Sequence, residues 1–239
     1  MSVAMSKKPR PVALAPTPAP NAANVGETFD FASSLVLLSN PFGAAAEAIR
    51  ALRTHLAAQH LQEGRRALAV CAAGQGAGCT FTAVNLALAF AQAGVRTMLI
   101  DADLRRPGVN ELIQPSGRVQ GLAQYLASED DDLSDKVVND VLPGLSVMYS
   151  GGPAGSPQEL LASDRFKNLI DFSLREYDLT IVDTPPANTC ADARRVSTVV
   201  GYSLVVTRRN LTYVDDIKTL IGQLHADHAR VIGTVLNEG

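Results

Sequence analysis

Short apolar runs alternate with longer amphipathic segments through most of the chain. The apolar runs are rich in branched residues and most are apolar on both sides, which is typical of strands in a parallel sheet that is covered on both faces. They predict strands at Ala67–Ala73, Val95–Ile100, Leu145–Tyr149, Leu179–Val182, Ser203–Thr207 and Val231–Leu236. The segments between them predict helices at Pro41–His60, Thr80–Ala93 and Val214–His225. We therefore predict an α/β fold with a doubly wound, mostly parallel sheet, helices on both of its faces, and ligands at the carboxyl ends of the strands.

The first 40 residues differ in composition from the rest. They are rich in Ala, Pro, Asn and Ser, and the run from Pro16 to Pro20 cannot build helix or sheet ladders, because proline lacks the amide N–H. We therefore expect residues 1–40 to form a flexible tail and residues 41–239 to form one domain.

Composition and charge exclude several classes of protein. Of the 239 residues, 46% are apolar and 19% are charged, so the chain can form a normal core and is not wholly disordered. The net charge of −3 argues against a general nucleic-acid coat or a polybasic membrane binder. No apolar run approaches the ~20 residues of a membrane span, and no hydrophobic stretch follows the basic residues near the N-terminus. The three scattered cysteines do not indicate a disulfide framework, and together these features predict a cytoplasmic protein.

A glycine-rich segment lies where the first predicted strand ends and a helix begins. It reads Gly74-Gln75-Gly76-Ala77-Gly78-Cys79-Thr80. Such a loop lets backbone N–H groups approach a phosphate, and the dipole of the following helix favours the negative charge. Thr80 stands where the hydroxyl group of a P-loop holds Mg²⁺. The alternative is a strand-to-helix turn without a ligand.

Cys79 departs from the P-loop pattern, which requires Gly-Lys-Ser or Gly-Lys-Thr at this point. The lysine supplies positive charge to the phosphates, and this chain has no lysine between Lys8 and Lys136. A helix N-terminus can lower the pKa of a thiol, and a thiolate here would repel phosphate. We expect instead a small, neutral side chain that fills space.

Three acidic residues follow two of the predicted strands. Asp101 and Asp103 come after one strand and would share a face if that strand continued. Asp183 follows four mostly apolar residues, which is the pattern of a Walker B strand. These carboxylates could bind Mg²⁺ or polarise a nucleophile. The structural alternative for Asp101 and Asp103 is to cap the helix that follows.

Taken together, these motifs resemble those of the bacterial tyrosine kinases of capsule and exopolysaccharide synthesis, which belong to the MinD/ParA branch of P-loop NTPases. The resemblance covers about residues 41–237. Beside the glycine loop and the acidic strand ends, its marks are Glu47-x-x-Arg50-x-x-Arg53, Asn85-Leu86-Ala87, Leu104-Arg105-Arg106-Pro107, Gly121-Leu122, Gly152-Pro153, Ser156–Leu161, Thr184-Pro185-Pro186 with Asp192-Ala193, and Gly233–Asn237.

The resemblance implies a role for each group of residues. Asp101, Asp103 and Asp183 would be the catalytic acids, and they would serve metal binding and activation of a tyrosine hydroxyl group. Mg²⁺ would be held by Thr80, Asp101 and Asp183. ATP would be bound by Gly76, Ala77, Gly78, Cys79, Thr80 and Phe81, with Asn237 near the adenine.

The resemblance also implies partners. The helix face with Glu47, Arg50 and Arg53 would join subunits into a homo-oligomeric ring. The same spacing is also that of a solvated helix face, on which Glu47 and Arg50 could form a local pair. The cytoplasmic segment of a membrane polysaccharide co-polymerase would be the partner, and it would hold the chain at the inner membrane.

Two departures from the family pattern bear on activity. The loop lysine is Cys79, and a cluster of tyrosines after the last strand is replaced by five dispersed tyrosines. The sequence therefore favours a kinase-like protein with impaired phosphoryl transfer, or else a catalytically inactive regulatory and assembly subunit. A partition-type ATPase would carry another lysine early in the loop. A reductase with a bridging iron–sulfur cluster would need exposed cysteines, whereas Cys71 lies in a predicted buried strand.

Overall fold

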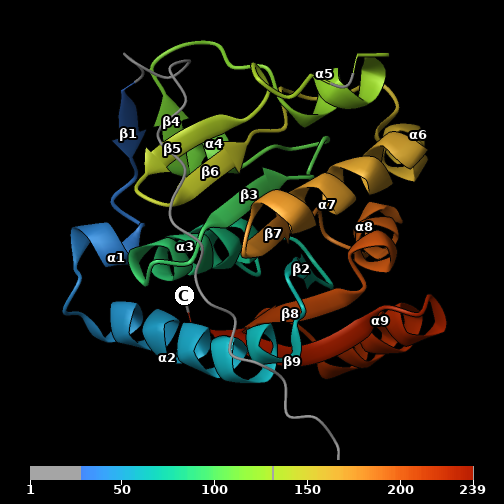
Figure 1. Cartoon of the computed structure of the whole chain (residues 1–239). Helices are drawn as coiled ribbons and strands as arrows, with labels where there is room; N and C mark the ends of the chain where they lie inside the picture. The colour runs from blue at the N-terminus through green and yellow to red at the C-terminus, as the bar shows by residue number, and fades with distance from the viewer. Residues whose placement is uncertain (1–27, 131, 239) are drawn as a thin grey trace, which may run out of the picture.

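The fold is a seven-stranded sheet between layers of helices, with a two-stranded sheet beside it (Figure 1). The computed structural model describes residues 28–130 and 132–238. The strand order in the large sheet is β5-β6-β3-β7-β2-β8-β9, and all pairs are parallel except β5 with β6. The predicted doubly wound, mostly parallel α/β fold is confirmed.

All six predicted strands are present, with slightly different ends. The large sheet contains β2 (Ala67–Ala72), β3 (Thr97–Asp101), β5 (Val138–Leu142), β6 (Leu145–Met148), β7 (Leu179–Asp183), β8 (Tyr202–Arg208) and β9 (Arg230–Asn237). The small sheet pairs β1 (Phe29–Phe31) with β4 (Ile113–Pro115) in antiparallel orientation. The sequence pattern did not predict β5, because Asn139 and Asp140 interrupt its apolar residues. In the structure Asp140 also departs from strand geometry, with a left-handed φ of 51°.

The three predicted helices are also present. The helices are α1 (Val36–Ser39), α2 (Ala44–Gln59), α3 (Cys79–Gln92), α4 (Val109–Leu112), α5 (Leu122–Ala127), α6 (Pro157–Ala162), α7 (Asp164–Glu176), α8 (Asp192–Val200) and α9 (Val214–Ala226), with a 3₁₀ turn at Leu61–Glu63. Within residues 28–130 and 132–238, no helix is both long and apolar enough to cross a membrane.

Separate apolar cores hold the helices on the two faces of the sheet. Leu68 and Val70 of β2 belong to the core that α2 and α3 share. The neighbouring residue Ala69 points to the other face, where it joins the core of α7 and α8. Figure 1 shows α3 and α7 on opposite sides of the sheet. Because side chains alternate along a strand, an apolar run is buried on both faces.

The ordered domain begins before residue 41, so the predicted boundary at residue 40 is wrong for residues 28–40. β1 pairs with β4, and Leu35 is fully buried. The N–H of Val36 donates a hydrogen bond of 3.0 Å to Oδ1 of Asn85 in α3. The segment looked like a tail because its pairing partner lies about 80 residues further along the chain. The rest of the predicted tail, residues 1–27, lies outside the described residues.

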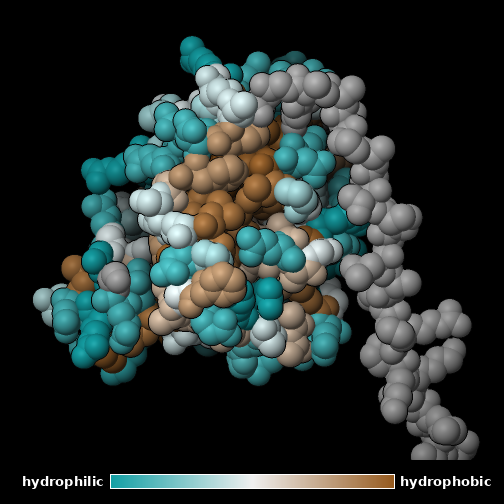
Figure 2. Space-filling model, turned by 90° about the vertical axis from the view of Figure 1, so that its left-hand side faces the viewer, coloured by the Kyte–Doolittle hydropathy of each residue, from teal (hydrophilic) through white to brown (hydrophobic). Residues whose placement is uncertain are grey.

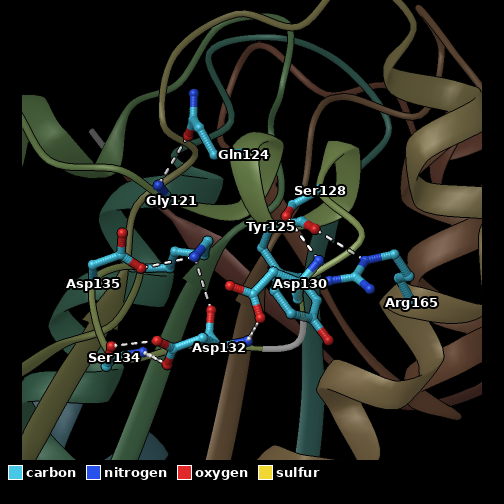
Figure 3. A network of polar contacts seen from close by, with 10 residues as sticks. Gly121, Gln124, Tyr125, Ser128, Asp130, Asp132, Ser134, Asp135 and Arg165 are labelled. Carbon is cyan, nitrogen blue, oxygen red and sulfur yellow. Dashed lines mark hydrogen bonds and ion pairs between the residues drawn. The ribbon is translucent and has the colours of Figure 1, made fainter.

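A polar network fixes the connection between α5, the end of β6 and α7 (Figure 3). Gln124 accepts a hydrogen bond from the N–H of Gly121 at 2.9 Å and donates one to the carbonyl of Gly151 at 3.0 Å. Arg165 of α7 lies over the ring of Tyr125, 4.5 Å from its centroid, and donates to the Tyr125 carbonyl. These contacts hold the segment that follows β6 in place at the carboxyl edge of the sheet.

An apolar hollow lies on the face that carries α1 and α3 (Figure 2). It is a groove of about 440 Å³, and its lining includes Leu38, Leu88, Ala91, Leu142 and Pro143. Leu88 and Ala91 belong to the C-terminal half of α3. The groove therefore lies at the other end of this helix from the glycine loop.

If residues 28–40 belong to the domain, truncation of Leu35 should destabilise it. Leu35→Ala should lower the free energy of unfolding by about 2–5 kcal/mol, because it leaves a cavity in the core. Leu38→Ala is the matched control, since Leu38 is 36% exposed, and its loss should be clearly smaller. Urea denaturation measures both values, and equal values would contradict the assignment.

Candidate active site

The parallel sheet brings the predicted acids and the glycine loop to one edge. β7 lies between β3 and β2, and Asp183 is paired in register with Asp101 on one side and with Val70 on the other. The glycine loop leaves β2 at the same edge and enters α3 at Cys79. The three groups that the sequence places at strand ends therefore converge in space.

Two glycines give the loop its shape. Gly76 and Gly78 have φ values of +75° and +90°, in the left-handed region that favours glycine. A Cβ atom at Gly78 would also overlap Nδ2 of Asn237. That Nδ2 atom donates a hydrogen bond of 3.1 Å to the carbonyl of Ala77, so Asn237 lies directly against the loop. Phe81 is half-buried in the first turn of α3.

The thiol group of Cys79 points into the sheet. Its Sγ atom donates to the carbonyl of Val70 at 2.9 Å, beside the hydroxyl group of Thr184, which donates to the same carbonyl at 3.0 Å. Burial raises the pKa of Cys79 well above its ordinary value, and the nearby carboxyl group of Asp183 raises it further. The side chain is therefore a neutral thiol at neutral pH, and the loop has no cation at this position.

Asp183 is a buried acid that lies near the side chains of Thr80 and Cys79, but neither of them forms a hydrogen bond of good geometry with its carboxylate. Neither carboxylate oxygen receives a hydrogen bond from the described part of the chain. Burial raises the pKa of Asp183 to about 7, although the side chains of Thr80 and Cys79 partly oppose the shift. A buried carboxylate with no donor is costly, so the arrangement calls for a cation or a proton at this point.

Asp101 and Asp103 are tied to the backbone of the loop that follows β3. Asp101 accepts N–H groups from Asp103 at 3.1 Å, Gly108 at 3.3 Å and Val109 at 3.2 Å. β3 ends at Asp101, so Asp103 does not continue the strand and the two acids do not share a strand face. Burial and repulsion from Asp183 raise the pKa of Asp101 well above its ordinary value, so Asp101 and Asp183 titrate as a pair.

Asp103 orders the next part of this loop. Its Oδ1 atom accepts the N–H groups of Arg105 at 3.1 Å and Arg106 at 2.9 Å. Its Oδ2 atom has no hydrogen-bond partner among the described residues. Asp101 therefore caps the start of α4 through Gly108 and Val109, as the structural alternative expects. Asp103 instead binds N–H groups of the loop before that helix, and one of its oxygens stays available.

The residues at this edge fit Mg²⁺. The hydroxyl group of Thr80 lies 3.3 Å from the point where a Cβ atom on Gly108 would stand, and Thr80 also acts on the pKa of Asp183. In the described ranges, no three His, Cys, Asp or Glu side chains converge to form a complete protein cage for a metal. Mg²⁺ does not need such a cage, because it keeps several waters and takes one or two carboxylates with phosphate oxygens.

The three predicted oligomerisation residues lie on α2, and two of them have contacts inside the domain. Glu47 and Arg50 form the local pair that their spacing predicts, at 3.4 Å. Arg50 also donates to the carbonyl of Pro41 at 2.7 Å, and Arg53 donates to the carbonyl of Ala89 in α3 at 3.4 Å. Glu47 is the exposed member of the set.

Sequence reasoning missed two arginine contacts at the site. Arg105 forms a two-pronged ion pair with the buried carboxylate of Asp192, with Nε–Oδ2 at 2.7 Å and Nη2–Oδ1 at 3.3 Å. Arg208, the last residue of β8, donates from Nη1 to the carbonyl of Gly76 at 3.0 Å. The only sequence signal for these contacts was the position of each arginine in the chain. Arg105 follows β3 and Arg208 ends β8, and both strands end at this edge of the sheet.

A hollow of about 400 Å³ borders the acidic loop. It is lined by residues from the segments after β3, β4 and β6, including Pro107, Asn110, Gln114, Arg118 and Ser150. Pro107 follows the loop that carries Asp101 and Asp103. The hollow therefore touches the end of this loop, but none of the three acids lines it.

Comparisons with known proteins give one consistent family. A family profile described as an AAA domain matches residues 65–221. The tyrosine-protein kinase etk of Escherichia coli K12 is 34% identical over 200 residues, which cover 84% of this chain and 27% of that protein. The putative tyrosine-protein kinase CapB of Staphylococcus aureus is 26% identical, over 86% of this chain and 90% of its own length.

Solved structures give the same result. The kinase domain of Escherichia coli tyrosine kinase ETK has a TM-score of 0.80 and 33% identity, and the match covers 85% of this chain and 79% of that domain. The cell division ATPase MinD of Pyrococcus furiosus has a TM-score of 0.61 at 20% identity, with 72% of each chain covered, and so shares the fold. This chain spans about a quarter of the length of etk.

The unpartnered carboxylate makes Asp183 a residue that weakens the ligand-free fold. Asp183→Asn should raise the free energy of unfolding at pH 8 by about 1–3 kcal/mol, because it removes a buried charge that has no donor. Because the pKa of Asp183 is about 7, the wild-type chain regains stability as the pH falls through 7. The stability difference between Asp183→Asn and the wild-type chain should therefore be smaller at pH 6 than at pH 8. Denaturation of both chains without nucleotide or Mg²⁺ measures this difference.

Asp178→Asn is the control for that experiment. Asp178 precedes the same strand but is paired with Arg96 at 3.3 Å. Its substitution should lower stability slightly, by at most about 1 kcal/mol. A loss of stability in Asp183→Asn as well would show that Asp183 has a structural partner.

Proposed function

This chain belongs to the family of bacterial tyrosine kinases, and we propose that it is a kinase-like, nucleotide-binding component of a capsule or exopolysaccharide system in which phosphoryl transfer is slowed by Cys79. The observation that carries the proposal is the contrast between two positions. The carboxylate of Asp183 has no hydrogen-bond partner among the described residues and could bind a cation. Cys79, in contrast, has a neutral thiol at the position where the family pattern has a lysine.

Nucleotide binding can survive the loss of the lysine. The N–H groups of Ala77 and Gly78 donate to no acceptor in the described part of the chain, and the N-terminus of α3 adds a favourable dipole. Thr80 and Asp183 would hold Mg²⁺, with Asp101 behind them. When bound, Mg²⁺ would neutralise charge on the phosphates. Asn237 lies at the rim of the loop, which suits the predicted position near the adenine.

The acids are placed to handle a hydroxyl proton. Two backbone amides fix Oδ1 of Asp103, which leaves Oδ2 to accept a hydrogen bond from an incoming hydroxyl group. Burial raises the pKa of Asp103, which makes it a better proton acceptor than an exposed carboxylate. We assign this role to Asp103, with Asp101 ordering the loop around it.

Loss of the lysine should affect the rate more than binding. Removal of one preorganised donor to a transition state costs about 10²–10³ in rate. Arg105 lies in the acidic loop, but its guanidinium group is taken up by the ion pair with Asp192. This contact favours the second candidate function, a catalytically inactive regulatory and assembly subunit of the same system.

The partner that we propose is the cytoplasmic segment of a membrane polysaccharide co-polymerase. The support is the family relationship to the tyrosine-protein kinase etk and the putative tyrosine-protein kinase CapB. We place this chain in the cytoplasm, peripheral to the inner membrane through that partner.

Restoring the lysine tests the proposed defect. Cys79→Lys should raise the rate of ATP turnover by about 10²–10³, because it supplies the missing cation. Cys79→Ser is the control and should give no gain, since it changes the side chain without adding charge. A coupled ADP-release assay measures both. Turnover by the wild-type chain at the rate of Cys79→Lys would contradict the proposal.

Glu47 is the best probe of the proposed ring. Its side chain is 74% exposed and its pair with Arg50 is weak, so Glu47→Arg should leave the fold intact and shift sedimentation from an oligomer to a monomer. Asp215→Arg is the matched control, because Asp215 pairs with Lys218 at the same spacing and the same 3.4 Å on α9. Equal behaviour of the two variants would argue against a ring built on α2.

A further inference from the structure

Two neighbouring strand ends hold two successive carbonyl groups of the glycine loop. Arg208 ends β8 and is paired in register with Asn237 at the end of β9. Arg208 donates to the carbonyl of Gly76 at 3.0 Å, and Asn237 donates to the carbonyl of Ala77 at 3.1 Å. The loop is therefore clamped from the side of the sheet edge.

The clamp sets the direction of two amides. In a trans peptide unit the carbonyl and the following N–H point in opposite directions. With the Gly76 and Ala77 carbonyls held towards the strand ends, the N–H groups of Ala77 and Gly78 point away from them. Neither N–H donates to an acceptor in the described residues, and Ala77 is only 2% exposed. Unpartnered amides that point the same way are what an anion site requires, and of these two residues Ala77 is buried and Gly78 is half-buried.

The turn that follows Arg208 is closed by hydrogen bonds. Its N–H donates to Oγ1 of Thr212 at 2.9 Å, and the N–H of Thr212 donates back to the Arg208 carbonyl at 3.0 Å. The N–H of Arg209 donates to the carbonyl of Asn237 at 2.9 Å, which ties this turn to the end of β9. Leu211, in the same turn, packs beside Gly76. The turn therefore fixes the position of the Arg208 backbone, from which the guanidinium group extends.

The chemistry of Arg208 suits the gap that Cys79 leaves. A guanidinium group is charged at every physiological pH and carries five N–H donors. In the described part of the chain, this group donates one hydrogen bond to the loop and none to a carboxylate. By contrast, Arg105 is paired with Asp192 and Arg209 is paired with Glu238.

We propose that Arg208 is a positioning residue that takes over part of the role of the missing loop lysine: it holds the Gly76 carbonyl outward, so that the loop amides face the phosphates, and it places a positive charge beside them. The inference rests on the proposed nucleotide-binding function and deepens it. It assigns the loop a cation from β8, more than 120 residues away in sequence from the loop.

The first test is the affinity for ADP in the presence of Mg²⁺, measured by calorimetry on the full chain. Arg208→Met should weaken binding about tenfold, because it removes a charged hydrogen bond. Arg208→Lys keeps the charge and one donor, so it should restore most of the affinity. Arg209→Met is the matched control and should change affinity by less than about twofold, since its ion pair is exposed. No effect of Arg208→Met would overturn the proposal.

A second test separates this role from general support of the fold. In the Cys79→Lys background the new lysine supplies the cation, so Arg208→Met should then weaken ADP binding by only about threefold or less. An undiminished tenfold loss in that background would show that Arg208 does not substitute for the lysine.

Backbone ¹⁵N relaxation of residues 75–79 without nucleotide keeps the inference distinct from the proposed function. Arg208→Met should increase the mobility of this loop relative to Arg209→Met. If the wild-type chain binds no ADP, the proposed function fails. If ADP binds but loop relaxation is unchanged in Arg208→Met, only the clamp is wrong.

Discussion

The register of β7 between β3 and β2 is the constraint on which the whole site depends. It sets the carboxylate of Asp183 beside Asp101 and beside Val70. Val70 in turn accepts the thiol hydrogen of Cys79, so the same register decides where the first residue of α3 points. A shift of one residue would move Asp183 to the opposite face of the sheet. The position of each acid and of the loop therefore follows from one set of backbone hydrogen bonds.

That arrangement lowers the stability of the ligand-free fold, because it places two acidic side chains next to each other in the interior. Asp183 lies in the interior with no donor, and Asp101 lies next to it with three backbone amides. The site therefore stores an electrostatic penalty that a cation would relieve. A lysine in the loop would add a positive charge that partly offsets these carboxylates. In this chain Cys79 contributes no charge, so under our proposal the loop amides, the dipole of α3, Arg208 and a metal ion would together hold the phosphates.

Much of this could be predicted from the sequence, because the signals are local. The buried strands showed as apolar runs, the glycine loop and the acids stood at strand ends, and the Glu47–Arg50 pair followed from helical spacing. The neutral state of Cys79 was also predicted, and burial against Val70 gives the physical reason. What failed was long-range: β1 pairs with β4, and Arg208 reaches Gly76 across 132 positions. Neither contact leaves a pattern in a short window of sequence.

The central claim is that a loop without its lysine still binds nucleotide through its amides and a metal ion held by Asp183 and Thr80. Titration calorimetry of ADP into the wild-type chain, once with Mg²⁺ and once with a chelator, tests it most directly. We expect saturable binding with Mg²⁺ and affinity at least about tenfold weaker in the chelator, since the buried carboxylates then repel the phosphates. An absence of binding under both conditions, or equal affinity in the two, would contradict the account.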